Sequence, residues 1–135
     1  MVCAKDVMST EIITITKDAT MQHVIRLLVT RGITGLPVVS DDMEMLGIVT
    51  EKDVLKMLYD RNVNIKSAEA LMTPNVICFD ENDDLIAVFK GLVENNFRRV
   101  PILSQGKLVG IISRTDIIKF LSKSAAKPAE TESEE

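Results

Sequence analysis

Apolar and polar positions along the chain switch between two periods. The β-branched run Ile12-Ile13-Thr14-Ile15 predicts a short strand. Apolar residues then recur from Met21 to Val29 at the spacing of an amphipathic helix, which Asp18 or Thr20 would cap and Gly32 would end. Two more strands and a second helix are expected after it, at residues 36–39, 45–49 and 51–59. The predicted order is β-α-β-β-α.

The second half of the chain has the same pattern. It predicts strands near Val76–Phe79, Val100–Leu103 and Leu108–Ile112, with helices at Asp83–Asn95 and Arg114–Leu121. Met8 aligns with Met72, and Pro37 aligns with Pro101, both at an offset of 64. The offset falls to 63 after the next turn, which is one residue shorter in the second copy. The chain is therefore an internal repeat.

The repeat predicts the domain boundaries and the fold class. We expect copy one at residues 4–60, a polar linker at 61–67, copy two at 68–122 and a disordered acidic tail at 123–135. A copy of this length would be marginally stable alone. We therefore expect an α+β fold in which two pseudo-symmetric β-α-β-β-α repeats pack sheet to sheet.

A short motif recurs where the last strand of each copy meets its last helix. Gly47-Ile48-Val49-Thr50-Glu51-Lys52-Asp53 corresponds to Gly110-Ile111-Ile112-Ser113-Arg114-Thr115-Asp116. A hydroxyl residue followed three positions later by an acid can form a capping box. The same place, a helix N-terminus, also favours small anionic ligands. The motif alone leaves both interpretations open.

Composition excludes several classes of function. The net charge is −4, of which the tail carries −2, so the body lacks the basic surface of a dedicated nucleic-acid binder. We see no apolar stretch long enough to span a membrane and no signal peptide, and we expect a cytoplasmic protein. Cys3, Cys78 and His23 lack the spacing of a zinc site. No nucleophile and base pair up in the sequence, and we expect no enzyme activity and no catalytic or metal-binding residues.

The chain resembles a tandem pair of CBS domains, a Bateman module. The resemblance rests on the two Gly-to-Asp motifs and on two further pairs of segments, which are Val7-Met8-Ser9 with Leu71-Met72-Thr73-Pro74, and Gly35-Leu36-Pro37-Val38-Val39 with Arg99-Val100-Pro101-Ile102-Leu103. Such modules are regulatory. The resemblance implies an adenosine-containing ligand, such as AMP, ADP, ATP or S-adenosylmethionine, bound in clefts between the repeats, and signalling in trans to a partner protein. No cofactor is required.

The resemblance also implies two ligand sites, each combining both copies. In each, the Asp of one copy would bind ribose, while the segment before the Pro and the first strand of the other copy would enclose the base. Site A would comprise Thr50, Lys52, Asp53, Val76, Phe97, Arg98, Arg99 and Pro101. Site B would comprise Ile12, Ile33, Thr34, Pro37, Ser113, Arg114 and Asp116.

The two sites differ in charge. Site A has Lys52 and Arg98 where site B has Thr115 and Thr34, and the cation of site B is Arg114. Because charge-assisted hydrogen bonds to phosphate are strong, we expect a phosphorylated adenosine to prefer site A.

Family members often form homodimers through the helices that follow each motif, and we expect a homodimer here. The candidate surfaces are Val54 with Leu58 and Ile117 with Leu121. The alternative hypothesis is a ligand-free protein–protein interaction module, in which the two hydroxyl/carboxylate pairs are only helix caps.

Overall fold

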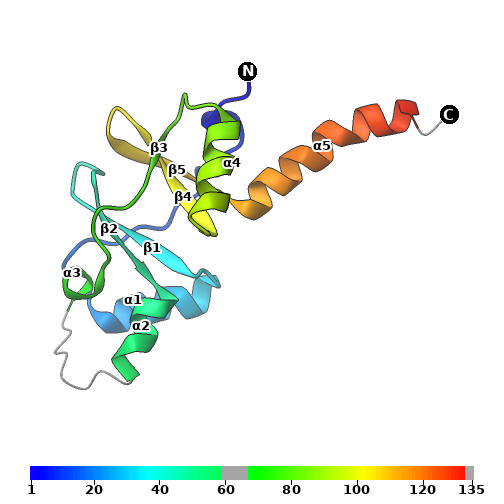
Figure 1. The fold of residues 1–135 in the computed structure, drawn as a ribbon. Coiled ribbons are helices and arrows are strands. Elements are labelled where there is room, and N and C mark those ends of the chain that lie inside the picture. Colours follow the sequence, from blue (N-terminus) through cyan, green and yellow to red (C-terminus); the bar gives the residue numbers. More distant parts are fainter. Residues whose placement is uncertain (59–66, 133–135) are drawn as a thin grey trace. The chain divides into compact units, whose positions relative to one another are not determined.

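The computed structural model describes residues 1–58 and 67–132. The first copy contains η1 (Ala4–Asp6), α1 (Met21–Arg31), β1 (Gly35–Val39), β2 (Met45–Thr50), α2 (Glu51–Leu55) and η2 (Lys56–Leu58). The second copy contains α3 (Ala68–Leu71), β3 (Phe79–Asp80), α4 (Leu85–Glu94), β4 (Arg99–Ser104), β5 (Lys107–Ser113) and α5 (Arg114–Glu132). Figure 1 shows these elements.

The strands form two sheets, which confirms the predicted α+β class. One sheet is the antiparallel hairpin β1-β2, and the other has the order β3-β4-β5 with β3 parallel to β4. The prediction of a strand at Ile12–Ile15 is wrong, because these residues do not form a regular strand. Its pairing is a single parallel bridge, in which Ile15 donates to the Pro37 carbonyl and accepts from the Val39 N–H. The corresponding β3 is also short, so each copy uses only the end of its apolar run.

Two boundaries from the sequence differ from the structure or lie outside it. The linker at 61–67 lies outside the described residues except for Ser67, as does Tyr59 of the predicted helix 51–59. The tail expected to be disordered continues α5 as far as Glu132, and residues 133–135 are not among those described.

The compact units of the structure do not coincide with the sequence repeats. Unit 1 combines Met1–Ile12 with most of the second copy from Cys78 onward. Unit 2 is built from the described parts of Ile13–Ile77 together with Gly106–Leu108. The opening segment of each copy therefore belongs to the unit that holds the rest of the other copy.

Equivalent hydrogen bonds hold the opening segment of each copy in its unit, and we call these two the exchanged segments. In unit 1 the Ala4 N–H donates to the Asp83 carbonyl at 2.9 Å. In unit 2 the Ala68 N–H donates to the Ala19 carbonyl at the same distance, and both pairs are related by the offset of 64. Both alanines are completely buried. Ala4 and Ala68 therefore make the same contact, each in its own unit.

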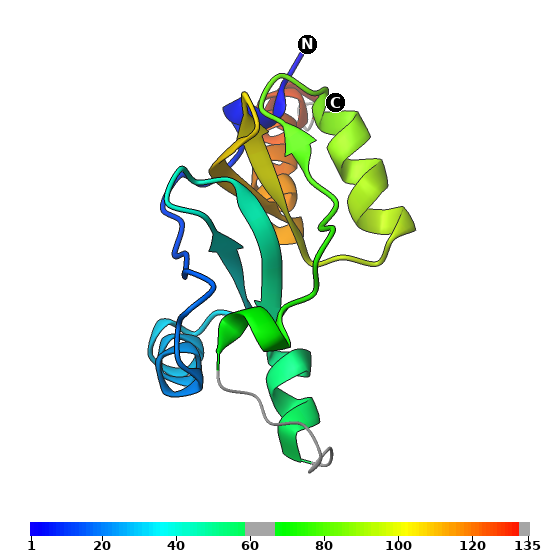
Figure 2. The same cartoon turned by 90° about the vertical axis from the view of Figure 1, so that its left-hand side faces the viewer.

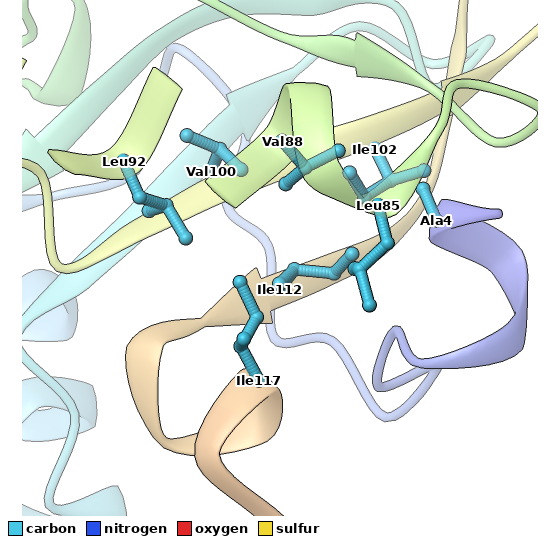
Figure 3. Close-up of a cluster of buried hydrophobic side chains, with 8 residues drawn as sticks. All are labelled: Ala4, Leu85, Val88, Leu92, Val100, Ile102, Ile112 and Ile117. Carbon is cyan, nitrogen blue, oxygen red and sulfur yellow. The ribbon is translucent and has the colours of Figure 1, made fainter. Parts of the chain in front are cut away.

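The core of unit 1 lies between α4, the sheet and the start of α5. Figure 3 shows Val88 and Leu92 of α4 packed toward the β-strand side chains and Ile117 of α5. The full set of buried apolar side chains in this cluster is Ala4, Leu85, Val88, Leu92, Val100, Ile102, Ile112 and Ile117. Ala4 thus completes a core that residues of the second copy otherwise supply.

Unit 2 has an equivalent core on the β1-β2 hairpin. Its buried members are Ile15, Val24, Leu36, Val38, Val49 and Ala68. Strand β2 leads directly into α2 (Figure 2), so the hairpin core fixes where that helix begins. Val54 of α2 packs against this core, and Ile117 is buried in the core of unit 1. Ile117 is wrong as a candidate dimer surface, because its side chain is buried in the core of unit 1, whereas Val54 is half-buried and stays a prediction.

The exchanged segments also explain the glycine of each motif. A Cβ on Gly47 would lie 2.7 Å from Met72 Sδ and 2.8 Å from the Thr73 carbonyl oxygen. A Cβ on Gly110 would lie 2.5 Å from Met8 Sδ and 3.0 Å from the Ser9 carbonyl oxygen. Each glycine therefore lets an exchanged segment lie directly on the strand that precedes the helix.

We predict that Gly47→Ala lowers the free energy of unfolding by about 1–3 kcal/mol, because the new methyl group overlaps backbone that cannot move freely. Gly35→Ala is the matched control, since a Cβ there meets no atom closer than 3.6 Å. Urea denaturation of both variants checks this. Equal stability of the two variants would contradict the close packing of the exchanged segment on β2.

Candidate functional site

Thr50 and Asp53 form a capping box at the start of α2. The Asp53 Oδ2 atom accepts from the Thr50 N–H at 2.9 Å and from the Thr50 hydroxyl at 3.0 Å. The Thr50 hydroxyl in turn accepts from the Asp53 N–H at 3.3 Å. Asp53 is only 7% exposed, the single buried charged side chain in the described part of the chain. The cap interpretation of the motif is therefore confirmed for this copy.

Ser113 and Asp116 repeat this arrangement at the start of α5. The Asp116 Oδ2 atom accepts from the Ser113 N–H at 2.8 Å, and the Ser113 hydroxyl accepts from the Asp116 N–H at 3.1 Å. In both copies the hydrogen bonds of the cap are accepted by Oδ2. Capping through this oxygen fixes the orientation of each carboxylate, and an ionised carboxylate has further lone pairs that can accept hydrogen bonds.

The segment before each buried proline lies against the cap of its own unit. In unit 2 the Glu51 N–H donates to the Thr34 carbonyl at 2.9 Å. In unit 1 the Arg114 N–H donates to the Arg98 carbonyl at 3.0 Å. The structure thus brings together, within one unit, residues that the sequence assigned to different sites. The pairing of each cap with the other copy remains a prediction.

The remaining residues expected at the sites fall into three groups by exposure. Lys52, Arg98 and Arg114 are exposed, while Ile12, Ile33, Thr34, Val76, Phe97 and Arg99 are half-buried. Pro37 and Pro101 are fully buried. Both prolines therefore hold their strands in place and offer little surface to a ligand.

Sequence reasoning missed the side-chain hydrogen bonds of Arg114. Its Nε donates to the Phe97 carbonyl at 2.6 Å, and its Nη2 donates to Asn96 Oδ1 at 3.1 Å. Copy one has Glu51 at the position of Arg114 and Gly32 at the position of Asn96. These two differences between the copies could have indicated the hydrogen bonds. From the sequence alone, Arg114 is interpreted only as a cation that could bind phosphate.

Other chemistry finds little support among the described residues. They contain no group of three or more His, Cys, Asp and Glu side chains placed to hold a metal ion. Burial raises the pKa of the Cys78 thiol above its ordinary value, which disfavours the reactive thiolate. None of the described helices is both long and apolar enough to cross a membrane.

Solved structures of known proteins share this fold. The CBS domain pair of protein MJ0100, in complex with 5′-methylthioadenosine and S-adenosyl-L-methionine, aligns with a TM-score of 0.79 and 26% identity, covering 92% of this chain and 98% of that one. CBSX2 in complex with AMP aligns with a TM-score of 0.84 and 23% identity, covering 93% and 99% of the two chains. At that identity, the second likeness bears on the fold alone.

Sequence comparison gives the same relationship. An uncharacterized protein of Methanocaldococcus jannaschii, MJ1225, is 33% identical over 117 residues, which are 87% of this chain and 42% of that protein. The chain spans between 23% and 42% of the first three curated relatives that it matches. The family model of the CBS domain matches residues 4–60 and again residues 68–123. The chain therefore belongs to the CBS domain family and is a tandem CBS pair.

Proposed function

We propose that this CBS pair is a cytoplasmic regulatory module that binds an adenosine-containing ligand and signals in trans to a partner protein. The ligand class is AMP, ADP, ATP or S-adenosylmethionine. The observation that carries the proposal is the pair of carboxylates, Asp53 and Asp116, each held through Oδ2 by its own helix cap. CBS pairs generally regulate rather than catalyse, and this chain consists of the pair itself.

The chemistry of the caps suits a ribose. A carboxylate that is held through one oxygen by a helix cap can accept hydrogen bonds from a ribose hydroxyl, as an acidic residue does in dinucleotide-binding folds. Because the cap fixes the carboxylate before the ligand arrives, little conformational entropy is lost on binding. The ligands of MJ0100, 5′-methylthioadenosine and S-adenosyl-L-methionine, both contain adenosine and support this ligand class.

The charges support a preference of phosphorylated ligands for site A, the one that contains Asp53. Lys52 follows the Thr50 cap and is exposed, and Arg98 is exposed in the segment before β4. In site B the corresponding residues are Thr115 and Thr34. The one cation of site B, Arg114, is already hydrogen-bonded to protein oxygens. These hydrogen bonds of Arg114 support the proposed preference for site A.

We expect Asp53→Ala to abolish AMP binding, measured by calorimetry and by thermal shift. Wild-type protein with AMP at 100 times its Kd should gain about 2.7 kcal/mol of stability. Asp84→Ala is the control, because Asp84 caps α4 by accepting from the Ile86 N–H at 2.9 Å and lies outside both proposed sites. Both variants should lose about 1 kcal/mol of stability through the missing cap.

Two outcomes would count against this assignment. Unchanged AMP affinity in Asp53→Ala, with loss of binding in Asp116→Ala, would show that the site is assigned to the wrong copy. No stabilisation of the wild type by any adenosine compound would reject the ligand and favour the interaction module.

Exchanging Lys52 and its counterpart Thr115 between the copies tests the phosphate preference. Lys52→Thr should weaken AMP binding about tenfold, as expected for one charge-assisted hydrogen bond at a solvent-accessible site, and should leave adenosine binding unchanged. Thr115→Lys, the reciprocal change, provides the matched control. Competition titrations with AMP and adenosine give the ratio. Equal weakening of both ligands would show that Lys52 does not act through phosphate.

A second candidate function, dimerisation, is favoured by the exposed apolar side chains of the helices. Ile25 and Val29 of α1 are 41% and 74% exposed. Their counterparts Phe89 and Val93 of α4 are 49% and 55% exposed. Leu55 and its counterpart Ile118 are also exposed. Both repeats expose these apolar side chains. A second molecule of the same chain could therefore bind to them through an isologous contact.

We predict that the wild type is a dimer in analytical ultracentrifugation and that Val93→Lys shifts it toward monomer, because a buried unpaired ammonium disfavours the interface. Gln105→Lys adds the same charge at an exposed turn and serves as the control. A monomeric wild type, or an unchanged dimer in Val93→Lys, would contradict this interface.

A further inference from the structure

We propose that Arg114 is a positioning residue, which fixes the segment Asn96–Arg98 against the start of α5 and does not itself bind phosphate. This inference rests on the proposed function, since that segment contains two residues expected to contact the nucleotide. All the contacts of Arg114 that support this role lie inside unit 1.

The guanidinium of Arg114 connects the start of α5 to the segment Asn96–Arg98. Its Nε donates to the Phe97 carbonyl at 2.6 Å and its Nη2 donates to Asn96 Oδ1 at 3.1 Å. The main chain adds a third bond, from the Arg114 N–H to the Arg98 carbonyl at 3.0 Å. Three consecutive residues are therefore bound to one residue of α5.

The segment itself is a turn that gains from such support. Asn96 follows Asn95, the C-cap of α4, and has a φ of 55°, in the left-handed region. The Phe97 N–H donates to the Leu92 carbonyl at 2.9 Å, which closes the helix end. Beyond these residues the chain enters β4 at Arg99. The side chains of Phe97 and Arg98 thus depend on how well this turn is fixed.

Copy one lacks the same support. Its turn has Gly32 at a φ of 60°, and its helix begins with Glu51. Among the described residues, the corresponding contact is the main-chain bond from the Glu51 N–H to the Thr34 carbonyl. A glycine offers no side-chain acceptor and a glutamate offers no donor. The fork of Arg114 is therefore specific to the segment that carries Phe97 and Arg98.

The geometry also argues against Arg114 as a phosphate ligand. Arginine presents its donors in a rigid planar fork, and here the donors on Nε and Nη2 are directed at protein oxygens. A phosphate that took the side-on edge formed by Nε and Nη2 would have to replace these protein oxygens, which would release the turn that holds Phe97. Arg114 therefore orients the segment Asn96–Arg98.

Three variants separate position from charge. Arg114→Lys keeps the positive charge but cannot reproduce the fork. Arg114→Met removes both. Asn96→Gly keeps a residue that tolerates positive φ, as Gly32 does in copy one, and removes only the side-chain acceptor. Lys119→Met, at an exposed position of the same helix, controls for the general loss of a cation.

The first readout is amide hydrogen exchange of Phe97 and Arg114 in the ligand-free protein. We expect faster exchange at both amides in Arg114→Lys, Arg114→Met and Asn96→Gly, with wild-type exchange in Lys119→Met. Because this readout needs no ligand, it tests the positioning role even if the proposed function fails. Wild-type exchange in Arg114→Lys would overturn the inference.

The second readout is the affinity for AMP and for adenosine. We expect Arg114→Lys to weaken both ligands about tenfold, the cost of ordering roughly one residue at binding instead of beforehand, and the ratio of the two affinities to stay unchanged. A loss of AMP affinity in Arg114→Met with adenosine affinity retained would show that Arg114 binds phosphate, which would overturn the inference. Absence of any binding to wild-type protein would reject the proposed function and leave the exchange result standing.

Discussion

The structure depends on the packing of each exchanged opening segment against the strand that leads into the functional helix. Ser9 exchanges two main-chain hydrogen bonds with Ile111 of β5, at 2.9 and 3.0 Å. Thr73 exchanges the corresponding two with Ile48 of β2, at 2.8 and 3.0 Å. Each of these strands ends at the hydroxyl residue of a capping box. The segment that opens one copy therefore supports the carboxylate of the other.

This arrangement explains why a regulatory pair can be built from two copies that are individually small. A single copy would lack the alanine that completes its core and the segment that pairs with its last strand. The exchange supplies both, and covalent continuity makes the segment always available. The caps then add local stability at the same two points. Structure and proposed ligand chemistry thus use the same residues, because a carboxylate that caps a helix through one oxygen retains the other for a ribose hydroxyl.

Much of the fold was predictable because periodicity and the repeat report on local structure. The helices and most strands lie where the hydrophobic pattern placed them, and the capping boxes follow from the spacing of Thr50 with Asp53 and Ser113 with Asp116. The exchange was not predictable. Ala4 and Ala68 occupy equivalent positions, so the pattern is identical whether each packs on its own copy or on the other. The prediction of a strand at Ile12–Ile15 was wrong for a related reason. β-Branched composition does not reveal how many residues pair with a neighbouring strand.

The candidate site shows the same limit. Charge differences between the copies identified Lys52 and Arg98, because sequence records charge directly. The role of Arg114 depends on the direction of its guanidinium, which only the structure provides. The likeness to the CBS pair of MJ0100 with bound adenosine ligands supports the chemistry, while the composition of each site across the two copies is what the resemblance to the family implies.

The most direct test of the central claim is a crystal structure of the protein grown with AMP at a concentration that fills one site. The account predicts ribose hydroxyls within hydrogen-bond distance of Asp53 Oδ1, with the phosphate near Lys52 or Arg98. AMP bound at Asp116 with an empty site at Asp53, or bound away from both carboxylates, would contradict it.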